Sequence, residues 1–256
     1  MANAIPFPKD TGPRAGGGKI VDRAKHGGKL LKRVSEEELM DVPLRARAYA
    51  EADFSEPNSK FIALFSDKFP AFNGQHILDL GCGPADITLR LAARYPQAKA
   101  TGLDGSGSML EIARKAILQH SSLAHRVDVR RWHIGQEENP LGSQAFDAVV
   151  SNSLLHHMRD PLDLWKAIRA CAAPDAAVLV MDLIRPQSLV EAREIVAKYA
   201  GGETEILKVD FLKSLLAAYR PAKVMEQLAS IGMDFLHIEV VSDRHFAVFG
   251  SMEASL

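Results

Sequence analysis

Cysteine is scarce in this chain: among its 256 residues only Cys82 and Cys171 occur. Two cysteines are too few for a disulfide framework or a cysteine-rich zinc site. No apolar run approaches the roughly 18 residues that a membrane-spanning helix needs, and no stretch resembles a secretory signal. A formal net charge of −1 also argues against a generally basic nucleic-acid binder. These absences predict a cytoplasmic protein with no metal site and no membrane contact.

The even charge balance hides a basic N-terminal segment. Residues 1–33 hold eight Lys and Arg against two Asp, a net charge of +6, together with six glycines. With few large apolar side chains, this segment cannot bury enough surface to offset its loss of conformational entropy. We therefore expect residues 1–42 to form a mobile, basic, glycine-rich arm. Residues 1–33 either contact nucleic acid or another acidic partner, or serve only as a solubilising tail.

The most informative segment is a strand that runs into a glycine turn. Residues 76–80 are mostly apolar, Gly81 and Gly83 follow, and an amphipathic helix begins at about Asp86. Glycines let the backbone approach a ligand closely, and the first amides of the helix point toward that ligand. A dinucleotide fingerprint would place a third glycine at position 86. Because an aspartate stands there, and because Asp79 precedes the turn, the pattern favours a different nucleotide-like cofactor.

Two later segments continue the pattern. Residues 98–103 read as a second strand that ends in Asp104, about twenty residues after Gly83. An acid at this distance can accept hydrogen bonds from both ribose hydroxyls; the alternative is an aspartate that only caps a helix or turn. Residues 146–151 read as a fourth strand, which leads through Asn152 to His156 and His157.

Together these segments resemble the class I S-adenosylmethionine-dependent methyltransferases. The run Leu78–Pro84 resembles their first motif, although Ala85 stands where the family often has a third glycine. Residues 146–157 resemble the fourth-strand motif of the small-molecule branch. The resemblance implies an α/β fold: a seven-stranded, mostly parallel sheet with helices on both faces and an antiparallel last strand. The alternation of strand and helix patterns also favours a parallel sheet.

The chain is expected to form one methyltransferase domain, residues 43–256, behind the arm. Helices within residues 43–70 would lie over the cofactor as a lid. Residues 185–220 read as two helices broken by Gly201 and Gly202. The family inserts substrate-covering elements at this point in the chain; the alternative is a packing decoration.

The resemblance implies S-adenosylmethionine as cofactor and S-adenosylhomocysteine as product, and it assigns residues to them. Asp104 would hold the ribose, Met109 would pack on the adenine, and Tyr49 would lie near the methionine moiety. The alternative for Tyr49 is an ordinary core tyrosine. The expected cofactor-binding residues are Tyr49, Asp79, Gly81, Cys82, Gly83, Asp104, Gly105, Ser106, Met109, Gly135, Gln136 and Asn152.

Residues that follow the strand ends are the candidates for chemistry. His156 is the leading candidate for a general base because the ordinary pKa of histidine lies near neutral pH. Alternatively, His156 and His157 position the helix start and orient the substrate. The expected catalytic residues are His156, His157, Tyr199 and His245, and the expected substrate-binding residues are Asp182, Arg185 and Arg244. Asp182 and Arg185 could equally form an ion pair that shapes the strand end.

The predicted function is therefore methyl transfer to a small-molecule acceptor by a monomer or homodimer. Two alternatives stay open. One is an RNA or protein methyltransferase that uses the basic arm. The other is a scaffold protein that binds S-adenosylmethionine without turnover.

Overall fold

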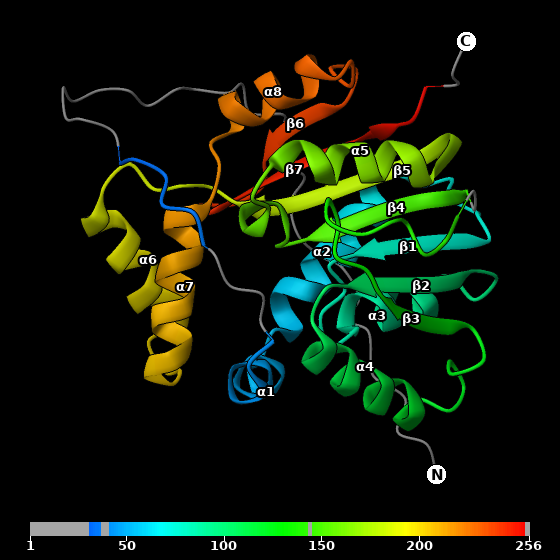
Figure 1. The fold of residues 1–256 in the computed structure, drawn as a ribbon, viewed down its shortest axis with the longest axis horizontal. Coiled ribbons are helices and arrows are strands. Elements are labelled where there is room, and N and C mark those ends of the chain that lie inside the picture. Colours follow the sequence, from blue (N-terminus) through cyan, green and yellow to red (C-terminus); the bar gives the residue numbers. More distant parts are fainter. Residues whose placement is uncertain (1–30, 37–40, 143–144, 254–256) are drawn as a thin grey trace.

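One mixed sheet organises the molecule (Figure 1). The computed structural model describes residues 31–36, 41–142 and 145–253, so the predictions for residues 1–30 and 37–40 lie outside the described residues. The strand order is β3-β2-β1-β4-β5-β7-β6. β7 runs antiparallel to both β5 and β6, and the other neighbouring strands pair in parallel. The strands are β1 His76–Leu80, β2 Lys99–Asp104, β3 Val127–Arg131, β4 Phe146–Asn152, β5 Ala172–Leu183, β6 His237–Val240 and β7 His245–Ser251. The predicted fold class is confirmed.

Helices cover both faces of the sheet and one of its ends. The α-helices are α1 Pro43–Glu51, α2 Ser55–Lys68, α3 Asp86–Arg94, α4 Gly107–Gln119, α5 Pro161–Cys171, α6 Leu189–Ala200, α7 Glu205–Ala217 and α8 Pro221–Ser230, and a short 3₁₀ helix, η1, spans Leu155–His157. Several begin at sequence signals for helix starts. Ser106, Asp160 and Ser188, for example, each accept a backbone hydrogen bond at the start of α4, α5 and α6. No helix among the described residues is long and apolar enough to cross a membrane.

The alternation of side chains along β1 divides the core into two layers. Leu78 and Leu80 belong to the cluster that contains Trp165 of α5 and Leu228 of α8. Ile77 points to the opposite face, into the cluster that contains Phe61 of α2. Successive residues of a strand face opposite sides of a sheet, so both faces of β1 are buried. Asp79 shares the face of Ile77 and is the one fully buried polar residue of β1, since His76 at the start of the strand is half-buried.

Strand β5 is longer than the sequence indicates. The apolar run predicts a start at Ala176, but the strand begins at Ala172, directly after α5. Phe146 pairs with Ala172, and the register then shifts so that Ala148 pairs with Ala177. Asp175 has a φ of 63° within this irregular stretch. A bulge of this kind adds unpaired residues to a strand, so its start is hidden from a pattern of alternation.

The expected helical insertion is present as α6 and α7, which lie beyond the carboxyl ends of the parallel strands (Figure 1). Residues 31–36 run along α7: the Val34 amide donates to the Leu216 carbonyl, and the Leu31 amide donates to the Gln187 carbonyl, 3.1 Å each. Although we expected the whole of residues 1–42 to be mobile, residues 31–36 therefore have ordered contacts with the insertion. These contacts bring the N-terminal segment to the same end of the sheet as the glycine turn.

Candidate functional site

The glycine turn after β1 has the backbone geometry that requires glycine. Gly81 has a φ of 75°, and a Cβ there would lie 2.9 Å from the Leu154 side chain. Gly83 has a φ of 52°, yet no atom lies within 4 Å of where its Cβ would be, so the turn is open on that side. Ala85 has a φ of 68° in the left-handed region, the conformation that would suit the third glycine of the family motif. The turn therefore keeps the motif's geometry with alanine in place of that glycine.

Two acids flank this turn. Asp79 is 1% exposed, and its Oδ2 accepts a hydrogen bond of 2.6 Å from the Thr88 hydroxyl on α3. Burial raises the pKa of Asp79 to about 7, and the charge of Asp104 adds to the effect. The Asp104 carboxylate accepts hydrogen bonds of 2.8 Å from the amides of Gly83 and Ser106. Burial also raises the pKa of Asp104, against the opposing effect of these bonds.

The start of α4 lies beside Asp104. The Ser106 hydroxyl accepts a hydrogen bond of 3.1 Å from the Met109 amide, so it caps the helix. Met109 is 4% exposed. Asp41, which sequence reasoning did not single out, also reaches this helix end, where its Oδ1 accepts a hydrogen bond of 3.2 Å from the Ser108 amide. Asp41 thus ties the N-terminal segment to the expected adenosine side of the site.

Tyr49 lies on α1, near Asp104 and Asp86. Burial raises the pKa of Tyr49 to about 12, and the negative charges of Asp104 and Asp86 contribute. Its ring packs on Phe54, with 4.6 Å between the ring centroids. The neighbouring helix α2 is fastened to the start of α3, because the Asn58 amide donates to the Asp86 carboxylate at 2.7 Å. Helix α2 therefore contacts the helix that follows the glycine turn.

The remaining expected cofactor residues are placed less evenly. Cys82 is buried within the turn, and Asn152 ends β4 with a buried Oδ1 that has no hydrogen-bond partner among the described residues. Gly105 follows β2 directly, and its carbonyl accepts from Arg131. Gly135 and Gln136 lie in an exposed turn after β3, where a Cβ on Gly135 would collide with the Asp163 side chain of α5.

His156 forms a buried pair with Asp182 of β5. The His156 Nδ1 and Asp182 Oδ1 are 2.6 Å apart, and the two side chains are 3% and 1% exposed. Although burial works against a charged imidazole, Asp182 raises the pKa of His156 above its ordinary value. The structure therefore pairs Asp182 with His156, whereas the sequence also allowed an ion pair with Arg185. Arg185 instead donates to the Ala218 carbonyl at 3.3 Å, and its buried Nε has no partner among the described residues.

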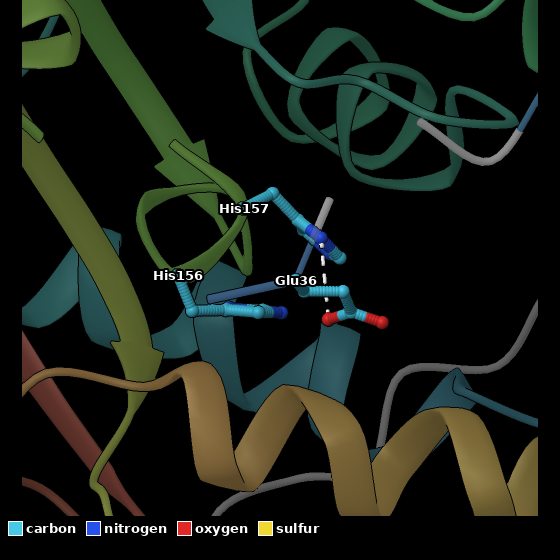
Figure 2. Close-up of side chains that lie close together, drawn as sticks. All are labelled: Glu36, His156 and His157. Carbon is cyan, nitrogen blue, oxygen red and sulfur yellow. Dashed lines mark ion pairs between the residues drawn. The ribbon is translucent and has the colours of Figure 1, made fainter. Parts of the chain in front are cut away.

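Glu36 is the site residue that sequence reasoning missed. Its Oε2 lies 3.5 Å from Nδ1 of His157 and accepts a hydrogen bond of 3.1 Å from the Ser214 hydroxyl of α7. Figure 2 shows its carboxylate close to the rings of both His156 and His157. The only sequence signal for Glu36 is that it follows a segment whose charge is otherwise mostly basic.

The residues at the β6–β7 hairpin contact one another and Tyr199 of α6. The Tyr199 hydroxyl donates to the Asp243 carboxylate, and the Arg244 guanidinium stacks 3.4 Å from the Tyr199 ring centroid. The Ser242 hydroxyl lies 3.0 Å from Nδ1 of His245. Burial lowers the pKa of His245 to about 4, and the charge of Arg244 contributes. These contacts join α6 to the hairpin and do not place Tyr199 with the His156–Asp182 pair.

Comparisons with known proteins find methyltransferases. Residues 78–178 match a protein-family model described as a methyltransferase domain. Trans-aconitate 2-methyltransferase from Escherichia coli strain UMN026 is 32% identical over 123 residues, which are 48% of this chain and 43% of that protein. The chain thus spans less than half the length of the curated relatives it matches.

Solved structures extend the likeness to more than four-fifths of the chain. A crystal structure of the plantazolicin methyltransferase BpumL, in complex with a triazolic desmethylPZN analog and SAH, has a TM-score of 0.63 at 13% identity and covers 83% of this chain and 92% of that one. A SAM-dependent methyltransferase from Aquifex aeolicus has a TM-score of 0.58 at 15% identity, covering 82% and 97% of the two chains. At these identities the likeness establishes the fold.

Proposed function

We propose that this chain, whose residues 78–178 match a methyltransferase domain model, is a class I S-adenosylmethionine-dependent methyltransferase that transfers the methyl group of S-adenosylmethionine to a small-molecule acceptor. One observation carries the proposal. Asp79 and Asp104 are two carboxyl groups of raised pKa at a glycine turn that is open at Gly83. S-adenosylmethionine brings a sulfonium and an ammonium group, and a cation near buried carboxyl groups stabilises their ionised form.

The residues around the turn fit the parts of this cofactor. Gly81 and Gly83 let the backbone approach it closely, while Asp104 can exchange its amide hydrogen bonds for the ribose hydroxyls. The unpartnered Oδ1 of Asn152 would face the methionine side. When bound, the cofactor supplies a methyl group already activated for displacement. The protein then has to align the acceptor behind that methyl and exclude water, an effect that can supply roughly 7–11 kcal/mol of the barrier.

The acceptor would enter from the side of α7 and η1. Arg33 and Arg185 lie there. Burial lowers the pKa of Arg185, and the charges of Arg220 and Arg33 lower it further. A carboxylate on the acceptor would relieve this repulsion and would give the buried Nε of Arg185 a partner. We therefore propose an acceptor that carries a carboxylate. The E. coli relative is named for trans-aconitate, which points to acids as the first class to screen.

Calorimetry tests cofactor binding. We expect Asp104→Asn to weaken S-adenosylmethionine binding by about 10-fold or more, since a charge-assisted hydrogen bond contributes about 1.5–3 kcal/mol. Asp128→Asn is the matched control, because Asp128 lies on the neighbouring strand β3, where its carboxylate is exposed and paired with Arg130. Equal affinities in both variants would contradict the assignment of Asp104.

Product formation separates an enzyme from a scaffold. The native protein should form S-adenosylhomocysteine when it is given labelled cofactor and a panel of carboxylate metabolites, and Arg185→Gln should raise the KM for the acceptor that responds. Turnover only with RNA or protein would favour the alternative that uses the basic arm. Cofactor binding with no acceptor in any class would favour a scaffold. Two buried free cysteines suit a reducing compartment, so the proposal includes a cytoplasmic location, which cell fractionation tests.

A further inference from the structure

We propose that Glu36, His156 and His157 form a binding site for one divalent first-row transition-metal ion. Each residue offers one ligand atom, and these atoms all lie within 4.8 Å of one another. Figure 2 shows both imidazole rings, which come from η1, directed at the carboxylate of Glu36, which comes from the N-terminal segment. A site of this kind needs residues from separate segments to converge, as they do here.

His156 is held in the orientation that metal ligands commonly have. Its Nδ1 is engaged with Asp182 Oδ1 at 2.6 Å. Asp182 is itself fixed, because it also accepts a hydrogen bond of 2.6 Å from the Leu183 amide. This leaves Nε2 of His156 as the free nitrogen, and the tip of the ring points toward Glu36 (Figure 2). Metal-bound histidines usually have such a carboxylate on their other nitrogen, which fixes the tautomer and raises ligand basicity.

Glu36 is also positioned by its neighbours. Glu36 accepts a hydrogen bond from Ser214, and its segment is anchored by Arg33. The Arg33 Nε donates to the Ala217 carbonyl at 2.6 Å, and its Nη2 donates to the His156 carbonyl at 3.1 Å. Arg33 thus links the segment that carries Glu36 to the turn that carries the histidines. The Glu36 side chain is 10% exposed, so the arrangement is not a chance contact of solvated side chains.

The Glu36 carboxylate is placed to share an ion with the histidines. It accepts a hydrogen bond from Ser214 and lies 3.5 Å from Nδ1 of His157. Carboxylate oxygens and imidazole nitrogens are both metal ligands, so a divalent ion between the three groups could bind to all of them.

The ligand set selects the class of metal. Two imidazoles and one carboxylate suit zinc, iron and their first-row neighbours, and they leave positions open for a further ligand. Two ligand atoms of a tetrahedral zinc ion lie roughly 3.3 Å apart, so rotation of these side chains has to close part of the observed separation. The open position would hold an oxygen of the acceptor. That role rests on the proposed methyl transfer, whereas metal binding itself does not.

The test uses the full-length, untagged protein after treatment with a chelator. Zn²⁺ calorimetry should give one site per chain, and Co²⁺ should give the visible spectrum of an ion with nitrogen ligands. Glu36→Gln and His157→Gln should each weaken Zn²⁺ binding by more than about 100-fold, because a lost ligand costs more than the 10–100-fold lost with a supporting partner. Asp182→Asn, which removes such a partner, should weaken it by about 10–100-fold. His125→Ala is the matched control, since His125 is an exposed histidine, and it should bind Zn²⁺ as the native protein does.

S-adenosylmethionine affinity, measured on the same samples, reports whether each variant is folded. Zn²⁺ binding that is absent from the native protein, or that survives in both Glu36→Gln and His157→Gln, would overturn the metal site. The Co²⁺ spectrum of the native protein decides the question even if a variant does not fold. A native protein that does not bind S-adenosylmethionine would instead refute the proposed function. Failure of the metal site and failure of the proposed function are therefore distinguishable.

Discussion

Replacing Asp79 with asparagine should stabilise the cofactor-free protein at alkaline pH. The carboxyl of Asp79 has a pKa raised to about 7 by burial, against an ordinary value of 3.8. Unfolding therefore releases a proton between these values, and the stability contributed by Asp79 falls as the pH rises from about 4 to about 7. Above pH 7 the carboxylate is ionised in both states and its contribution no longer changes.

The magnitude follows from the same values. A difference of about 3 pKa units, at 1.36 kcal/mol per unit, corresponds to about 4 kcal/mol as an upper limit. An asparagine would still accept the hydrogen bond from Thr88, but its buried amide hydrogens cost about 1–3 kcal/mol. That cost does not depend on pH. The cleaner quantity is therefore the change between pH 5 and pH 8, over which the variant should gain about 3 kcal/mol relative to the native protein.

Urea denaturation of the cofactor-free proteins from pH 5 to pH 8 measures this quantity. Comparison with the native protein cancels the titration of all other groups, and Asp128→Asn controls for loss of one carboxylate at an exposed position. Stability profiles of the Asp79→Asn variant and the native protein that run parallel across this range would refute the reasoning. The same pKa predicts that S-adenosylmethionine binds more tightly as the pH rises from 6 to 8, because bound cation favours the ionised carboxylate.

Three further predictions concern the turn, the lid and the anchored segment. Gly83→Ala and Gly142→Ala both place alanine at a positive φ with no atom near its Cβ, so each variant should lose about 1–2 kcal/mol of stability. Only Gly83→Ala should weaken cofactor binding in calorimetry. Equal cofactor affinities in the two variants would contradict the open turn as the binding face. Tyr49→Phe should weaken cofactor binding by several-fold without loss of thermal stability. Unchanged cofactor affinity would show that Tyr49 is an ordinary core tyrosine. Arg33→Ala should make residues 31–36 accessible to protease and lower turnover, while cofactor affinity stays within about 2-fold. Lys32→Ala should leave protease accessibility and turnover unchanged. If Arg33→Ala is as protected from protease as the native protein, Arg33 is not the anchor.

Local sequence signals explain why much of the fold was predictable. The sequence predicts a helix over Pro161–Cys171, and α5 has these bounds because Asp160 caps its start with Pro161 at the first position. The glycine turn and Asp104 were predictable for the same reason: a strand, two glycines and an acid at a fixed spacing constrain one another. Strand β6 was harder to predict, because none of its four residues is buried and the strand carries little apolar pattern.

The acceptor side of the site could be predicted only in part. His156 and His157 follow β4 in the fourth-strand motif, and Asp182 lies near the end of β5, so the sequence singled out all three residues. Their partner could not be foreseen, because Glu36 reaches them through tertiary contacts of Arg33 and Ser214 that leave no mark in the local sequence. The alternative ion pair of Asp182 was open for the same reason.

A crystal structure of the protein grown with S-adenosylhomocysteine tests the central claim most directly. The account predicts density for the ligand at the turn of Gly81 and Gly83, with its ribose hydroxyls on the Asp104 carboxylate. Ligand density at another place, or a turn that still holds Asp104 on the Gly83 amide with no ligand at saturating concentration, would contradict it.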